Sequence, residues 1–191
     1  MTAPRILVFA GSIRTGSLSA RLAALAAKEL ALADAEVTKI SLADYPLPIY
    51  DGDLEAKKGI PDNAARLARL IAAQQGVFIA TPEYNNSVPP LLKNAIDWVS
   101  RVEASGPARY RDKVFGIGST SDGMIGGARA LIDLRKIVQA GLGAILIPTK
   151  IEIGRAQDAF DEAGELIPEA PAKLLKRLCR QLVDIAGRLA D

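Results

Sequence analysis

Histidine is absent from the 191-residue sequence, and cysteine occurs only once, at Cys179. The absence of histidine excludes Ser-His-Asp and Cys-His nucleophilic catalysis and disfavours a zinc site. With one cysteine, the chain cannot form an internal disulfide. Any catalysis therefore has to rest on something other than these side chains, and a bound cofactor is the economical candidate.

An excess of charge of one sign is also lacking, because 24 Lys and Arg residues nearly balance 22 Asp and Glu residues and leave a net charge of +2. This balance disfavours nucleic acid and anionic membranes as partners and favours a small molecule. The sequence shows neither a signal segment nor an apolar run of bilayer length. We expect a cytoplasmic protein in which residues 1–191 form one domain, since domains commonly hold about 100–200 residues.

The stretch RILVFAGSIRTGSLS, residues 5–19, is typical of a buried strand that runs into a polar loop and then opens a helix. The first N–H groups of such a helix have no internal partner and face whatever lies above the strand. Two glycines and a set of polar side chains complete the loop: Gly11, Gly16, Ser12, Arg14, Thr15, Ser17 and Ser19. The stretch predicts a phosphate cradle, although a plain connection in which Ser17 caps the helix fits the same residues.

Two better-known phosphate motifs do not match this loop. In the P-loop pattern GxxxxGKS/T, Ser17 stands where the lysine belongs. In the dinucleotide pattern GxGxxG, Ile13 replaces the second glycine. Neither an ATPase nor an ordinary Rossmann site is supported.

A second polar loop, TPEYNNS, follows the apolar strand 76–80. Pro89 and Pro90 suit the first turn of the helix that comes next. We expect this helix to bury Val88, Leu91, Leu92, Ile96 and Val99. Trp98 is expected to pack beside this face, whereas Tyr84, in the loop, is expected to stack on a cofactor.

The remaining elements follow from apolar spacing and from breakers. After the opening loop we expect a helix through Leu30, an edge strand at 36–41, an irregular excursion at 42–59 and a helix from Pro61 through Ile71. A strand at 113–117 then leads into a glycine-rich loop at 118–127 and a helix carrying Ala128, Leu131, Ile132, Leu134 and Val138 that closes at Gly141. We then expect a fifth strand at 144–147 and an extension or small hairpin at 150–165. The last helix is expected after Pro168 and Pro171, with an apolar stripe of Leu174, Leu178, Leu182, Ile185 and Leu189.

Five strands that alternate with five helices predict a doubly wound parallel α/β sheet, because parallel neighbours need crossovers that cover both faces. In the flavodoxin-like strand order 2-1-3-4-5, ligands bind at the carboxyl ends of strands one and three. The loops GSIRTGSLS and TPEYN lie there, and STSDG would flank them from strand four.

The motifs GSIRxGS, TPEYNxSVPxxLKNAIDW and GGARAxxxLR together resemble the NAD(P)H-dependent FMN reductase family of flavodoxin-like proteins, in particular its bacterial quinone, chromate and azo-dye reductases. The resemblance implies that Ser12, Arg14, Ser17 and Ser19 hold the FMN phosphate and that Leu18 also belongs to the cofactor site. It further implies that Pro82, Glu83, Tyr84 and Asn85 contact the isoalloxazine ring and ribityl chain, and that Ser119 helps close the pocket. Members of this group often carry asparagine at the position of Ser19.

The resemblance also implies NADPH or NADH as electron donor, two-electron ping-pong reduction of quinones or similar acceptors, and a homodimer or homotetramer with the flavin near a subunit boundary. Chromate, azo compounds and free flavin are further acceptors of the same group. No catalytic side chain is required, because the flavin carries the chemistry. Arg129 is then a candidate for inter-subunit pairing or for the nicotinamide cofactor's phosphates, if it is not simply solvated.

A second functional class stays open, namely a flavodoxin-type electron carrier that binds FMN without oxidising NAD(P)H itself. Such a carrier usually needs a strongly acidic surface to dock on basic partners. The slightly basic composition of this chain favours the enzyme.

Overall fold

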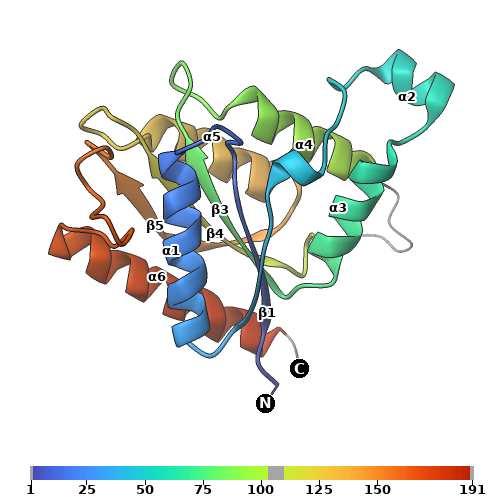
Figure 1. Cartoon of the computed structure of the whole chain (residues 1–191). Coiled ribbons are helices and arrows are strands. Elements are labelled where there is room, and N and C mark those ends of the chain that lie inside the picture. Colours follow the sequence, from blue (N-terminus) through green and yellow to red (C-terminus); the bar gives the residue numbers. More distant parts are fainter. Residues whose placement is uncertain (1, 103–109, 190–191) are drawn as a thin grey trace.

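The computed structural model describes residues 2–102 and 110–189, which build a parallel sheet between two layers of helices (Figure 1). The sheet consists of β1 (Arg5–Ala10), β2 (Glu36–Lys39), β3 (Gly76–Pro82), β4 (Val114–Thr120) and β5 (Ile145–Ile153). All four strand pairs are parallel, and the order β2-β1-β3-β4-β5 is the one predicted from the sequence.

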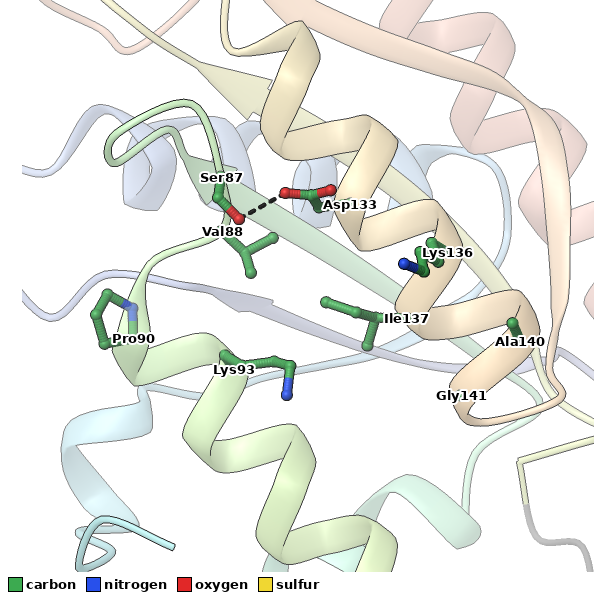
Figure 2. Close-up of a pocket in the computed structure, with 9 residues that line it drawn as sticks. All are labelled: Ser87, Val88, Pro90, Lys93, Asp133, Lys136, Ile137, Ala140 and Gly141. Carbon is green, nitrogen blue, oxygen red and sulfur yellow. Dashed lines mark hydrogen bonds between the residues drawn. The ribbon is translucent and has the colours of Figure 1, made fainter.

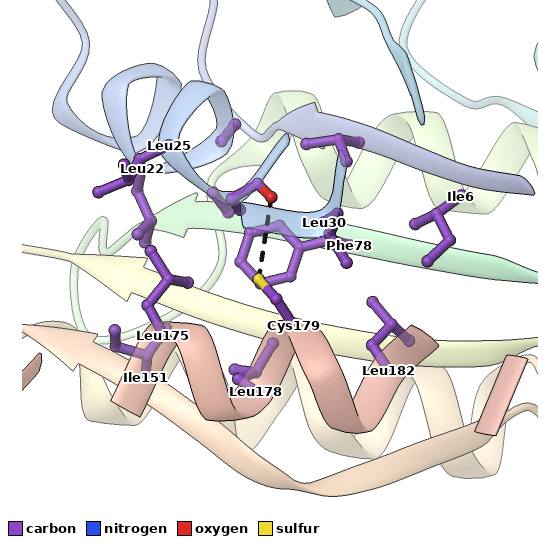
Figure 3. Close-up of a cluster of buried hydrophobic side chains, with 14 of the residues drawn as sticks. Ile6, Leu22, Leu25, Leu30, Phe78, Ile151, Leu175, Leu178, Cys179 and Leu182 are labelled. Carbon is purple, nitrogen blue, oxygen red and sulfur yellow. Dashed lines mark hydrogen bonds between the residues drawn. The ribbon is translucent and has the colours of Figure 1, made fainter. Parts of the chain in front are cut away.

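The helices divide between the two faces of the sheet. The helices α1 (Leu18–Leu32) and α6 (Glu169–Arg188) cover one face, and α3 (Asp62–Ala72), α4 (Pro90–Arg101) and α5 (Ala128–Lys136) cover the other. Figure 3 shows the core under α1 and α6, where Phe78 and Cys179 lie among leucines and isoleucines. Since β1 and β3 are apolar toward both layers, burial on both faces fixes them at the centre of the sheet.

The excursion at 42–59 is more regular than predicted. It contains a 3-10 turn, η1 (Leu42–Asp44), and a helix, α2 (Gly52–Lys58), that buries no residue. The helix forms because the Asp51 side chain accepts from the Asp53 N–H at 2.8 Å and because acids precede lysines along its dipole. An apolar-spacing argument misses such a helix, since it has no buried stripe.

Strands four and five are longer than predicted. The fourth strand runs through Ser119 to Thr120 and does not end at 117, so Ser119 is a strand residue and not a loop residue. The fifth continues past Pro148 to Ile153, and the β4–β5 register shifts between Phe115 and Ile117. Pro148 is tolerated because β5 is an edge strand. Beyond β5, the expected extension or small hairpin is an irregular segment with one antiparallel bridge, between Phe160 and Leu166.

Several apolar residues lie elsewhere than predicted. On α5, Ile132 is 62% exposed, and the helix continues as the π-helical turn η2 (Ile137–Gly141). The helix α6 begins at Glu169, which places Pro171 in its first turn, and its buried stripe is Leu175, Leu178, Cys179, Leu182, Val183 and Ala186. Among residues 2–102 and 110–189, no helix combines the length and the apolar character needed to cross a membrane.

Candidate functional site

The loops after β1 and β3 lie side by side at the carboxyl edge of the sheet. Ala10 pairs with Ala80, and the Gly11 N–H donates to the Ala80 carbonyl oxygen at 2.8 Å. A Cβ atom on Gly11 would lie 3.0 Å from Leu92 Cδ2, so any other residue there would require Leu92 on α4 to shift. The two loops that the sequence predicted to share a site therefore do lie together.

The first loop closes directly onto the start of α1. The Ser17 side chain caps this helix by accepting from the Ala20 N–H at 3.3 Å. The Ser17 N–H donates back to the Arg14 carbonyl at 3.1 Å, and Gly16 has a φ of +70°, which glycine adopts without strain. The amides of Leu18 and Ser19 precede the first intrahelical bond and so face out of the helix end. This end of α1 can hold an anion.

The polar side chains of the first loop differ in depth. Ser12 accepts from the Arg14 N–H at 3.3 Å, and the Arg14 side chain is exposed. By contrast, Ser17 is 4% exposed and Ser19 only 1%, and their hydroxyl oxygens are 2.9 Å apart. The predicted phosphate residues thus lie along the loop and the first turn of α1, and Ser19 is the most deeply buried of them.

The second loop is a tight turn. The Tyr84 N–H donates to the Ser87 carbonyl at 2.9 Å, and the Ser87 N–H donates to the Tyr84 carbonyl at 3.0 Å. Asn85 and Asn86 both have positive φ, 49° and 65°, which is the signature of a type I′ turn. Tyr84 stands 47% exposed on this turn, as expected of a side chain that the core does not hold.

The Glu83 carboxylate is directed at the start of α5. Its Oε2 accepts from the backbone N–H groups of Arg129 and Ala130, both at 3.0 Å. The N-cap of α5 is Gly127, which has no side chain, and the first turn holds no acid. Glu83 therefore supplies from another loop the acceptor that the helix lacks. The sequence shows only that the start of α5 lacks a capping side chain, and it does not show which residue supplies the cap.

Two more hydrogen bonds fasten the second loop to α5. The Arg129 guanidinium donates to Asn86 Oδ1 at 3.1 Å, and the Ser87 hydroxyl donates to Asp133 Oδ2 at 2.6 Å (Figure 2). Together with the contacts of Glu83, these bonds give the turn a fixed orientation relative to the sheet edge. Arg129, predicted to face a partner or a nicotinamide cofactor, already has an acceptor within its own chain.

Ser119 is hydrogen-bonded to the third loop, residues 121–127, near the start of α5. It is fully buried in β4, and its hydroxyl donates to the Gly126 carbonyl at 2.6 Å. Gly126 and Gly127 have φ values of 62° and 82°, and a Cβ atom on Gly127 would come within 3.0 Å of Ser119 Cβ. The Ser119 hydroxyl thus holds the backbone that enters α5.

Apolar side chains stand exposed on all three loops of this edge. Ile13 is 54% exposed on the first loop and Tyr84 47% on the second, while Met124 and Ile125 on the third are 81% and 48% exposed. Exposed apolar groups gathered at one edge commonly mark a binding surface. No group of three or more His, Cys, Asp and Glu residues that could hold a metal ion occurs within the described parts of the chain.

Comparison with known proteins agrees with this geometry. A family model described as NADPH-dependent FMN reductase matches residues 4–158. The chain is 38% identical over 167 residues to a quinone reductase of Escherichia coli (strain K12), covering 86% of each protein. It is 34% identical over 173 residues to a 2-hydroxy-1,4-benzoquinone reductase of a Burkholderia species, covering 90% of each.

Among solved structures, the flavoenzyme NAD(P)H:(acceptor) oxidoreductase FerB of Paracoccus denitrificans superposes with a TM-score of 0.78 at 28% identity. The match covers 97% of this chain and 98% of that protein. The chain thus shares its fold over nearly its whole length with an oxidoreductase, and the loop after β1 and the turn after β3 fall within residues 4–158, which match the family model. With the family model spanning most of its length and relatives above 30% identity, the chain belongs to the NADPH-dependent FMN reductase family.

Proposed function

We propose that this protein binds FMN tightly at the carboxyl edge of the sheet and reduces quinones with electrons from NADPH or NADH. FMN, when bound, accepts a hydride from a nicotinamide and passes the electron pair to an acceptor. The family membership supports flavin and nicotinamide use, and two relatives are named as quinone reductases.

The chemistry of the first loop fits a terminal phosphate. The segment GSIRTGSLS contains no acidic side chain, and it offers the exposed cation of Arg14 together with the Ser12 and Ser17 hydroxyls. The amides of Leu18 and Ser19 add donors at the positive end of α1. A short closed loop of this kind suits the phosphate of FMN better than the pyrophosphate of FAD.

The observation that supports quinones as the electron acceptors is the apolar rim formed by the exposed side chains of Ile13, Tyr84, Met124 and Ile125. Apolar and aromatic groups bury the faces of a planar carbonyl compound, whereas the oxyanion chromate would gain little from them. Met124 can adapt to acceptors of different outline, because methionine is unbranched and flexible. The rim therefore supports quinones as the main acceptors, with azo compounds or free flavin as secondary ones.

The turn 83–87 would hold the flavin ring with its backbone donors, while Pro82, Tyr84 and Asn85 contact the ring and the ribityl chain. Its orientation does not depend on the cofactor, since Glu83, Asn86 and Ser87 already bond to α5. Backbone donors fixed in advance stabilise negative charge as it develops on the ring without any reorganisation.

Substitution of Ser17 by Asp tests the phosphate site. Aspartate is as good an N-cap as serine, so Ser17→Asp should keep α1 and the unfolding midpoint of the apoprotein. Its negative charge would stand against the FMN phosphate, and FMN affinity should fall at least about 100-fold. Riboflavin, which lacks the phosphate, serves as control and should bind as before. Unchanged FMN affinity in Ser17→Asp, or release of FAD from the purified protein, would refute the assignment.

Steady-state kinetics with benzoquinone test the reaction. If a single site serves donor and acceptor in turn, double-reciprocal plots of rate against benzoquinone concentration should give parallel lines at different concentrations of NADPH or NADH. A chromate series run alongside should give a much lower kcat/KM than the quinone series. If neither nicotinamide is consumed at a useful rate, the enzyme proposal is wrong and the electron-carrier alternative replaces it.

We also propose a cytoplasmic homodimer or homotetramer, assembled through the face of α4 and α5. The groove of Figure 2, about 670 Å³, lies between these helices and is lined in part by Val88, Pro90 and Ile137. The exposed Ile132 stands on the same helix α5. In light scattering, Ile132→Glu should lower the mass toward the monomer, whereas the matched variant Leu32→Glu, on the exposed end of α1, should not. A monomeric wild-type protein would overturn this proposal.

A further inference from the structure

The Ser19 hydroxyl lies behind the Ser17 hydroxyl in the first turn of α1. Side chains on a helix tilt toward its N-terminus, which directs the Ser19 hydroxyl at the cap residue. Its oxygen is 2.9 Å from Ser17 Oγ, and Ser17 is its only side-chain hydrogen-bond partner among the described residues. Ser19 is 1% exposed and Ser17 4%, so Ser19 is the more deeply buried of the two.

The hydrogen-bond capacity of Ser17 decides which hydroxyl donates. A serine hydroxyl has one proton and two acceptor lone pairs. Ser17 Oγ already accepts from the Ala20 N–H at 3.3 Å, so one lone pair and one proton remain. If Ser17 donated to Ser19, its proton would be used up, and the proton of Ser19, the more deeply buried residue at 1% against 4% exposed, would have no acceptor. Because an unsatisfied buried donor is costly, the favoured arrangement has Ser19 donating to Ser17.

We propose that Ser19 is a positioning residue that turns the Ser17 proton toward the phosphate of FMN. With both lone pairs of Ser17 Oγ occupied by Ala20 and Ser19, its own proton has no partner among the described residues and is left for a ligand at the helix end. Phosphate is an acceptor without protons to give, so a hydroxyl fixed as a donor suits it. This inference rests on the proposed FMN site, and it reassigns Ser19 from a direct phosphate contact to a group acting through Ser17.

A double-mutant cycle on flavin binding tests this role without any turnover measurement. FMN and riboflavin dissociation constants are measured by flavin fluorescence on the apoprotein of wild type, Ser17→Ala, Ser19→Ala and the double variant. Ser17→Ala should weaken FMN binding about 10- to 100-fold, and Ser19→Ala about three- to tenfold. In the Ser17→Ala background, Ser19→Ala should have no further effect, and riboflavin affinity should change less than about twofold throughout. Ser100→Ala, on the exposed end of α4, is the matched control.

The possible outcomes separate this role from its rivals. Additive losses of FMN affinity would mean that Ser19 contacts the phosphate directly, and the positioning role would be wrong. Equal losses of FMN and riboflavin affinity in Ser19→Ala would mean that Ser19 only supports the loop, which also overturns it. If Ser17→Ala weakens FMN binding but Ser19→Ala does not, the inference fails while the proposed site stands. If Ser17→Ala is without effect, the proposed phosphate site itself fails.

Discussion

Removal of the Glu83 carboxylate should destabilise the apoprotein, because this side chain caps α5 from a different loop. Glu83→Ala removes two hydrogen bonds, each 3.0 Å long, that the carboxylate accepts from backbone N–H groups of α5. It also removes a negative charge at a helix start that has no side-chain cap of its own. Loss of a side-chain cap costs about 0.5–2 kcal/mol, and loss of the charge at the helix end about 0.3–1 kcal/mol. We therefore expect the free energy of unfolding to fall by roughly 1–3 kcal/mol. Glu83→Gln keeps an acceptor but loses the charge, so its free energy of unfolding should lie between those of the wild type and Glu83→Ala.

Urea unfolding of the flavin-free protein measures this effect, with Tyr84→Ala as the matched control. Tyr84 stands next to Glu83 but is 47% exposed, so its removal should leave the midpoint nearly unchanged while lowering flavin affinity or turnover. A midpoint unchanged in Glu83→Ala, with FMN affinity strongly reduced, would refute the capping role and make Glu83 a cofactor contact. A large loss of stability in Tyr84→Ala would place that ring in the core.

Three further predictions concern the scaffold. Trp98→Phe loses the 2.7 Å hydrogen bond to the Pro48 carbonyl, which should lower the free energy of unfolding by about 1–2 kcal/mol. The folded variant should also be cleaved faster by proteases within residues 46–59. Gly118→Ala should cost about 1–3 kcal/mol in urea unfolding, because the new Cβ would meet Ile151 Cγ2 at 2.8 Å. Burial raises the pKa of the Cys179 thiol to about 12. Since the unfolded thiol releases its proton near pH 8.5, the wild-type free energy of unfolding should decline from about pH 9 upward, relative to Cys179→Ala.

The parallel sheet could be predicted from the alternation of strands and helices, and its strand order from the flavodoxin-like fold that this alternation and the family resemblance indicate. Apolar runs such as Ile6–Phe9 mark strands that are buried on both faces, and the helices between them force parallel crossovers. That topology then determines which loops meet, and the contact between Gly11 and Ala80 confirms it. The turn from β1 into α1 could be predicted because its residues lie within one short segment, and its role in phosphate binding stays a prediction.

Roles that depend on contacts across loops could not be predicted in the same way. Glu83 and the start of α5 are 46 residues apart, and no local pattern pairs a carboxylate with a distant glycine cap. Ser119 was expected in a loop because its surroundings are rich in glycine and hydroxyl residues. It lies in β4 because both neighbouring strands, β3 and β5, continue beside it. Strand ends of this kind are set by pairing partners and not by residue type.

The segment LKNAIDW shows how one motif can carry a role that its own residues do not reveal. Asn94 and Trp98 lie one turn apart on α4, and both donate to the Pro48 carbonyl, at 2.9 and 2.7 Å. Asn94 also accepts from the Tyr50 N–H at 2.8 Å, and the Tyr50 ring meets the Trp98 ring edge-on at 5.0 Å. Within the excursion at 42–59, Leu42 is buried in the core under α3 and α4, whereas α2 buries no residue. These contacts with α4 therefore hold the part of the excursion around Pro48 and Tyr50. A polar residue inside this amphipathic helix therefore serves to dock a distant segment, and its partner became visible only when the excursion was folded against it.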